Sequence, residues 1–195
     1  MKKRNDRTDA AGRWLLIAGL VLTAMLAPVA QADPGKGARG MVASVHPLAT
    51  DAGVNVLKAG GNAVDAAIAT GLTLGAVEPW MSGIGGGGYM TIYLAASQEA
   101  KVIEFGMQAP AAAVADDYPL AGLGTNSSDA FNWPKVAGDT NIHGPLAAAV
   151  PGYIKGIGLA LQNFGTMTWQ DVFEPACQQA ELGLPIDWFS AQKIS

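Results

Sequence analysis

A run of four consecutive glycines, residues 85–88, constrains this chain more than any other feature of its sequence. It lies in the stretch Glu78-Pro-Trp-Met-Ser-Gly-Ile-Gly-Gly-Gly-Gly-Tyr89. Because glycine has no Cβ, such a run removes side-chain bulk where two segments, or a segment and a ligand, come very close together. We therefore expect the backbone to make a close approach here.

The run fits Gly-x-Gly-x-x-Gly at Gly83, Gly85 and Gly88, but its context argues against a nucleotide site. A dinucleotide fingerprint follows a strand and opens a helix whose N-terminus holds the pyrophosphate. Here an apolar helical stretch, residues 63–77, precedes the glycines, and a β-pattern, residues 89–95, follows them. No Gly-Lys-Ser/Thr ends the run, as a P-loop would require. The sequence predicts a tight bend that packs a helix closely against a sheet.

Two helices are expected before the glycines, joined by Gly60-Gly-Asn62. The first begins at Pro47, because proline suits a first helical position. The second is capped by Asn62, with Asp65 near its positive end, and its small and apolar residues predict burial on most sides. The face expected to be buried on the first helix consists of Leu48, Ala52, Val56 and Ala59.

The rest of the chain contains patterns typical of both strands and helices. Residues 41–45, 89–95 and 101–105 have β-character, and the last two are expected to form a hairpin. Residues 122–144 are rich in Gly, Asn, Ser and Asp, which indicates a long surface excursion. A helix is expected over residues 153–164. A last helix, opened by a capping box at Thr168 and reaching residue 181, is expected to break or kink early at Pro175.

Residues 1–32 have the three parts of a secretory signal: a basic head, an apolar run of fourteen residues and the small-residue site Ala30-Gln-Ala32. The run is short for the ~20 residues that span a bilayer. We therefore predict cleavage after Ala32, a periplasmic or secreted protein of residues 33–195, and no stable membrane anchor after cleavage. The lone cysteine, Cys177, excludes an internal disulfide.

Charge excludes one class of partner. The formal net charge is −4, with +3 in residues 1–32 and −7 in the remainder. An acidic chain without basic clusters is a poor ligand for phosphate backbones, so we expect no nucleic acid partner.

The residues alone predict no catalytic set, metal site or cofactor. His46 and His143 are far apart and have no neighbours at ligand spacing. Ser44 lies near His46 but not in a nucleophile elbow. Cys177 is expected to pack as a small hydrophobe. Three carboxylates are expected to be solvated or to cap helices: Asp65, Asp116 and Asp117.

Several motifs occur together in a fixed order. They are Met41-Val-Ala-Ser-Val-His-Pro-Leu-Ala49, Gly60-Gly-Asn-Ala-Val-Asp-Ala-Ala67, Val77-Glu-Pro79, Ser82-Gly-Ile-Gly-Gly-Gly-Gly-Tyr-Met90, Ala109-Pro-Ala111, Val150-Pro-Gly-Tyr-Ile-Lys-Gly156, Phe164-Gly165 and Ala180-Glu-Leu-Gly-Leu-Pro185. In this order they resemble the N-terminal part of the gamma-glutamyltranspeptidase (glutathione hydrolase) family, over nearly all of residues 40–190.

The resemblance implies an α/β (α+β) fold, as the incomplete N-terminal portion of the αββα sandwich of N-terminal-nucleophile hydrolases. It implies an exported precursor that cuts itself in two and exposes a threonine nucleophile, which transfers a gamma-glutamyl group to water or an amino acid. That threonine has no counterpart in residues 1–195. We therefore expect this chain to be inactive alone and to need a C-terminal subunit as its partner.

The resemblance also implies a substrate contact. The family typically has an arginine just before Ala-Pro, which pairs with the α-carboxylate of the substrate. This sequence has Gly106, Met107 and Gln108 there, and these are the predicted substrate-binding residues. A neutral amide cannot replace a bidentate guanidinium. A related amide or beta-lactam side-chain acylase is therefore an alternative to gamma-glutamyl transfer. A second alternative is a non-catalytic exported scaffold or binding protein that keeps half of the sandwich.

Overall fold

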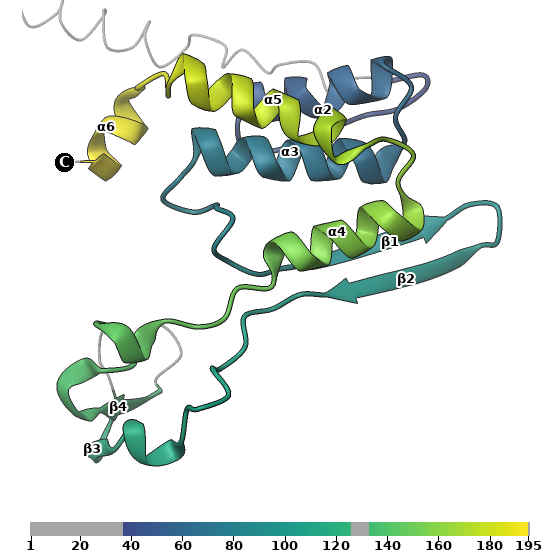
Figure 1. Cartoon of the computed structure of the whole chain (residues 1–195). Coiled ribbons are helices and arrows are strands. Elements are labelled where there is room, and N and C mark those ends of the chain that lie inside the picture. Colours follow the sequence, from purple (N-terminus) through teal and green to yellow (C-terminus); the bar gives the residue numbers. More distant parts are fainter. Residues whose placement is uncertain (1–36, 126–132, 195) are drawn as a thin grey trace, which may run out of the picture. The chain divides into compact units, whose positions relative to one another are not determined.

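The computed structural model describes residues 37–125 and 133–194. The elements below belong to the compact unit Ala38–Ser195. The predicted signal segment, residues 1–32, lies outside the described residues. Helices and strands are α2 (Pro47–Lys58), α3 (Ala63–Val77), β1 (Tyr89–Leu94), β2 (Glu99–Glu104), β3 (Leu120–Thr125), β4 (Pro134–Val136), α4 (Tyr153–Phe164), α5 (Trp169–Leu182) and α6 (Trp188–Ile194) (Figure 1). Across the described ranges no helix is both long enough and apolar enough to cross a membrane.

Helix α2 forms where predicted. Pro47 occupies its first turn, and the His46 side chain caps it by accepting a hydrogen bond from the Leu48 backbone N–H at 3.2 Å. Its buried face differs from the expected one, because Leu48 is only half-buried and Ala59 is exposed. At Gly53 the helix packs so closely against α3 that a Cβ would overlap the Thr70 hydroxyl. The residues that face the core are therefore Ala49, Ala52, Gly53 and Val56.

Helix α3 is the centre of the core. A capping box of Asn62 and Asp65 opens it, as predicted, and Glu78 ends it. It contacts α2, α5 and α4, which lie around it in Figure 1. Nine of its fifteen residues are buried, which confirms the expectation that most of its circumference is covered.

The hairpin also forms as predicted, with β1 and β2 antiparallel from the pair Tyr89 and Glu104 to the pair Leu94 and Glu99. Side chains alternate between its two faces. Ile92, Ile103 and the following Phe105 point into the core. The opposite face carries exposed apolar side chains, namely Tyr89, Tyr93 and Val102.

Residues 41–45 do not form the strand that their composition favours. None of the described backbone hydrogen bonds involves these five residues. A strand needs a neighbour for its N–H and C=O groups. No neighbouring strand lies beside residues 41–45 within the described part of the chain.

Two of the later elements, α4 and α5, lie where the sequence predicts them, whereas β3, β4 and α6 were not predicted. Within residues 122–144, the described part contains the end of β3 and all of the short strand β4. Helix α4 matches the predicted bounds, and Thr168 caps α5. Helix α5 continues through Pro175 from Trp169 to Leu182, so a break does not occur there. Proline removes one backbone hydrogen bond, but the buried neighbours Val172 and Ala176 hold the helix against the core on either side of it.

Candidate functional site

The glycine run lies backbone to backbone against the segment that follows β2. Gly88 and Phe105 exchange two hydrogen bonds, with N···O distances of 3.2 and 3.0 Å, which extend the hairpin ladder by one pair. A Cβ at Gly87 would lie 2.7 Å from the Phe105 carbonyl oxygen and 2.8 Å from the Met107 nitrogen. No side chain fits at this distance, so the expected close approach is confirmed.

The same run also meets the start of α4. The Gly86 carbonyl accepts hydrogen bonds from the backbone N–H groups of Gly152 and Tyr153, each at 3.1 Å. A Cβ at Gly152 would lie only 2.5 Å from the Phe105 carbonyl oxygen. Three segments that are distant in sequence, the glycine run, residues 105–108 and the N-terminus of α4, therefore converge.

The three predicted substrate-binding residues lie at one cleft of this junction, with a volume of about 560 Å³. Gln108 is fixed there by backbone hydrogen bonds to Val150, of 3.1 and 2.8 Å. Lys155 of α4 is the one basic residue that lines this cleft. The remaining lining comes from both walls: Ile103, Glu104, Phe105, Gly106, Met107, Val150, Pro151, Gly152, Gly156 and Leu159.

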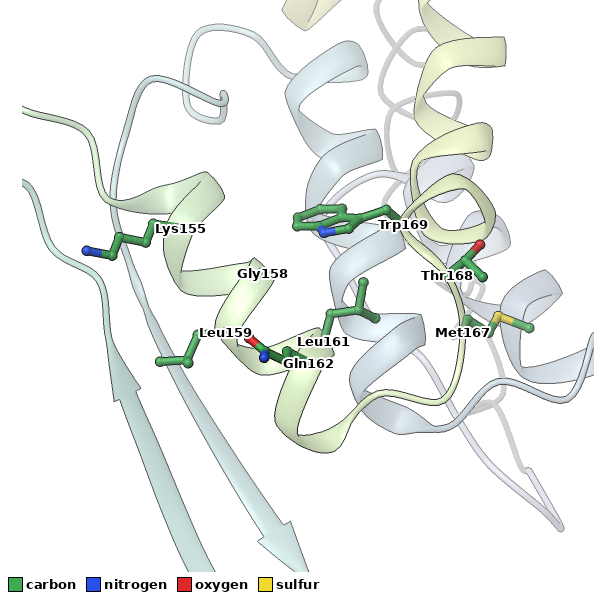
Figure 2. A pocket seen from close by; sticks show the side chains of 8 residues that line it. All are labelled: Lys155, Gly158, Leu159, Leu161, Gln162, Met167, Thr168 and Trp169. Atoms are coloured by element: carbon green, nitrogen blue, oxygen red, sulfur yellow. The ribbon is translucent and has the colours of Figure 1, made fainter.

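Lys155 also lines a second hollow on α4, of about 640 Å³, whose far wall is Trp169. Figure 2 shows the Lys155 side chain extending away from the Trp169 ring. Gly158 allows this arrangement, since a Cβ there would lie 3.0 Å from the indole. Lys155 and Gly158 were not predicted as site residues, and their only sequence signal is a spacing of three residues, which places them on one side of α4.

A side chain at position 106 would point to the side of the hairpin that faces away from the core. A Cβ built on Gly106 would have one atom near it apart from its own neighbours in sequence, the Tyr89 hydroxyl at 3.9 Å. Tyr89 belongs to the exposed face of the hairpin, away from the core. A side chain at position 106 would therefore start on the Tyr89 face, while the cleft beside α4 lies on the Phe105 face.

The other residues considered in the sequence form no catalytic or metal-binding arrangement among the described residues. The Ser44 hydroxyl bonds to the His46 carbonyl at 2.9 Å and to the Thr50 hydroxyl at 2.8 Å, so it is not paired with the imidazole. Over residues 37–125 and 133–194, no three His, Cys, Asp or Glu side chains gather at a possible metal site. Cys177 is exposed, and the expectation that it packs in the core is wrong. Ala176 takes the core-facing position, and the next residue points about 100° away from it.

Asp65 does more than cap a helix. Its buried carboxylate accepts hydrogen bonds from the Asn62 backbone at 2.8 Å, from the Thr166 hydroxyl at 2.6 Å and from the Thr166 and Met167 backbone N–H groups at 3.0 and 3.2 Å. Burial raises the pKa of Asp65, but these hydrogen bonds outweigh it and hold the pKa below its ordinary value. The carboxylate fixes the α4–α5 connection onto α3.

Comparison with known proteins gives the family. The family model described as Gamma-glutamyltranspeptidase matches residues 49–195. The glutathione hydrolase proenzyme of Bacillus subtilis (strain 168) is 41% identical over 165 residues, which are 85% of this chain and 26% of that protein. The acylase ACY 1 proenzyme of Pseudomonas sp. (strain V22) is 42% identical over 78% of this chain and 26% of its own length.

A solved structure agrees with these matches. The gamma-glutamyltranspeptidase of Helicobacter pylori superposes with a TM-score of 0.71 at 34% identity, over 83% of this chain and 43% of that chain. The chain thus has a partial α/β fold of that type, and it spans about a quarter of the length of the curated relatives it matches. On its sequence and on its fold, the chain belongs to the gamma-glutamyltranspeptidase family.

Proposed function

We propose that this chain is the N-terminal part of an exported N-terminal-nucleophile enzyme that breaks an amide bond and transfers the acyl group to water or an amine. The observation that carries the proposal is the convergence, in a chain of this family, of the glycine run with residues 106–108 and the start of α4, and the last two segments line one cleft. The threonine nucleophile and the oxyanion hole would come from a C-terminal subunit.

Two bare surfaces support a missing partner. One is the exposed hairpin face of Tyr89, Tyr93 and Val102. The other is the segment 41–45, whose backbone groups lack hydrogen-bond partners among the described residues. Exposed apolar faces and unpaired backbone N–H and C=O groups are costly in a folded protein. We propose that the C-terminal subunit covers both, and both relatives named above are called proenzymes.

Two substrate classes compete. Gamma-glutamyl amides are favoured by family membership, since one close relative is a glutathione hydrolase. A different acyl group is favoured by residues 106–108, which supply no guanidinium for an α-carboxylate, and another close relative is an acylase. Losing a charge-assisted contact of this kind costs about 1.5–3 kcal/mol, roughly ten- to a hundredfold in affinity. We therefore propose poor use of gamma-glutamyl donors.

Restoring the guanidinium tests this. In the protein made from the complete reading frame, Gly106→Arg or Gln108→Arg should raise kcat/KM for gamma-glutamyl-p-nitroanilide by about ten- to a hundredfold. Gln162→Arg adds the same charge to an exposed position of α4 outside the Gly106–Gln108 cleft and should change nothing. Release of p-nitroaniline is the measurement. No gain from either site variant would remove residues 106–108 from the substrate site, and no hydrolysis by any variant would favour a non-catalytic scaffold.

A further inference from the structure

We propose that the C-terminal subunit pairs a strand with the outer edge of β1, on the side of the hairpin next to α3, and leaves the outer edge of β2 unpaired. The inference rests on the proposed function, because the partner is the subunit proposed there. It concerns the backbone edges of the hairpin, which are distinct from its exposed face.

The ladder of the hairpin fixes which backbone groups point outward. Gly88 and Phe105 exchange two hydrogen bonds, and the same register continues through β1 and β2. Hydrogen-bonded and non-hydrogen-bonded pairs alternate along an antiparallel ladder. Every second residue of each strand therefore turns its N–H and C=O groups away from the other strand. These outward residues are Tyr89, Thr91 and Tyr93 on β1, and Ala100, Val102 and Glu104 on β2.

Both edges lack a neighbour in the described part of the chain. The sheet that contains β1 and β2 has two strands, and none of the described backbone hydrogen bonds outside that ladder comes from the outward residues. An open edge of this kind is a template for another extended chain. The occupant is therefore a strand, because an extended backbone matches a row of alternating donors and acceptors.

The composition of the two strands favours β1 as the edge that is paired. β1 has no charged residue and no proline, and four of its six residues are aromatic or β-branched. β2 carries Glu99, Lys101 and Glu104, and Lys101 forms an ion pair with Glu99 at 2.9 Å. Charged side chains, lysine above all, keep an exposed edge from pairing. The β1 edge has no such protection, so we expect it to be covered in the complete protein.

The surroundings of the hairpin favour the same edge. The residues that lead into β1 lie beside α3, since a Cβ on Gly75 would be 3.5 Å from the Cα of Gly83, whereas α4 packs against β2. One side of α3 is also uncovered. A groove of about 760 Å³ separates it from residues 41–45, and small exposed residues such as Ala63 and Ala67 line the groove. A strand added to β1 therefore has open space beside α3.

The C-terminal subunit is the occupant that fits. This chain spans 26% of the length of each of the two proenzymes named above, so most of the length of such a protein lies outside it. A second copy of this chain is the other source of a strand, and the experiment below distinguishes the two.

Amide hydrogen exchange at residue resolution tests the assignment in the complete, processed protein. The outward amides form three matched pairs across the ladder: Tyr89 with Glu104, Thr91 with Val102, and Tyr93 with Ala100. All six side chains are exposed, so a subunit that only covered the hairpin face would shield both strands alike. Pairing at the β1 edge should slow exchange in β1 at least about tenfold relative to β2, after correction for intrinsic rates.

Proline at one matched pair gives a second measurement. Thr91→Pro removes an outward donor from β1, and Val102→Pro removes the donor directly across the ladder. Proline is tolerated where the N–H faces solvent at a sheet edge, and it blocks pairing of that edge. Thr91→Pro should lower the recovery of the two subunits as one complex by about tenfold or more, and Val102→Pro should leave it unchanged.

The outcomes are distinct. Slower exchange in β1, with loss of the complex in Thr91→Pro alone, supports the inference. Equal or faster exchange in β1, or equal recovery of the two folded proline variants as complexes, overturns it and leaves the proposed function standing. Protection of β1 that disappears when a dimer is diluted to single copies assigns the edge to a second copy and also overturns it. Absence of any second fragment from the exported protein overturns the proposed function itself.

Discussion

Asp65→Asn is expected to lower the free energy of unfolding by about 2–4 kcal/mol, more than other single polar substitutions in the described residues. The buried carboxylate accepts from two backbone N–H groups and a hydroxyl at the α4–α5 connection, and from the Asn62 N–H at the start of α3. An asparagine turns one acceptor oxygen into a donor. At least one buried donor then faces another donor, and each unsatisfied buried group costs about 1–3 kcal/mol.

The second capping box of the chain supplies a matched control. Asp171 holds the same position in α5 that Asp65 holds in α3, and it accepts from the Thr168 backbone and hydroxyl at 2.9 and 2.6 Å. Because Asp171 is exposed and bonds only within its own turn, Asp171→Asn should cost much less. Denaturant unfolding of the complete protein measures both variants, and equal losses would show that the long-range bonds of Asp65 contribute little.

The stability that the Asp65 hydrogen bonds contribute should also depend on pH. The pKa of Asp65 is held below its ordinary value, because the hydrogen bonds outweigh the effect of burial. The folded state thus binds the proton less readily than the unfolded state. This contribution to stability is complete above the ordinary aspartate pKa of about 4 and is lost as the pH falls through the lowered value. Asp65→Asn should remove that part of the acid sensitivity.

Gly87→Ala is the second substitution with a large expected effect. The added methyl would lie 2.7–2.9 Å from backbone atoms of Phe105, Gly106 and Met107, and a backbone wall cannot rotate away. Overpacking of this kind costs about 1–3 kcal/mol. The clash should also move residues 106–108 and reduce amide hydrolysis by the complete protein.

Gly85→Ala is the control two residues away. A Cβ at Gly85 meets nothing within 4 Å, so this variant should melt and react like the wild type. Melting temperature and rate should fall together in Gly87→Ala alone. Similar losses in both variants would mean that the run is needed for its flexibility rather than for the close approach.

Local signals in the sequence predicted most of the secondary structure. The caps at Asn62 and Thr168 and the glycine run all depend on residues within a few positions of one another. Such short-range chemistry fixes where a helix or a hairpin begins. The family resemblance then pointed to residues 106–108, which the structure places at one cleft.

Contacts between distant segments could not be predicted in this way. Asp65 and Thr166 are 101 residues apart, so their hydrogen bonds depend on how α4 and α5 pack against α3. The position of the Tyr89 hydroxyl, 3.9 Å from where a Cβ on Gly106 would lie, depends on the hairpin register. Residues 41–45 have a strand composition, but strand formation also requires a neighbour that the described residues do not supply. Cys177 is exposed because its neighbour Ala176 faces the core, and which side of α5 faces the core depends on long-range packing.

The most direct test of the central claim is the intact mass of the exported protein made from the complete reading frame. The account predicts two fragments whose masses sum to that of a longer precursor without residues 1–32, plus one water, with the second fragment beginning at a threonine. Thr→Ala at that position should leave the precursor whole and inactive. A single uncleaved species from the wild-type frame, with no second fragment, would contradict the assignment of this chain to a self-processing acyl-transfer enzyme.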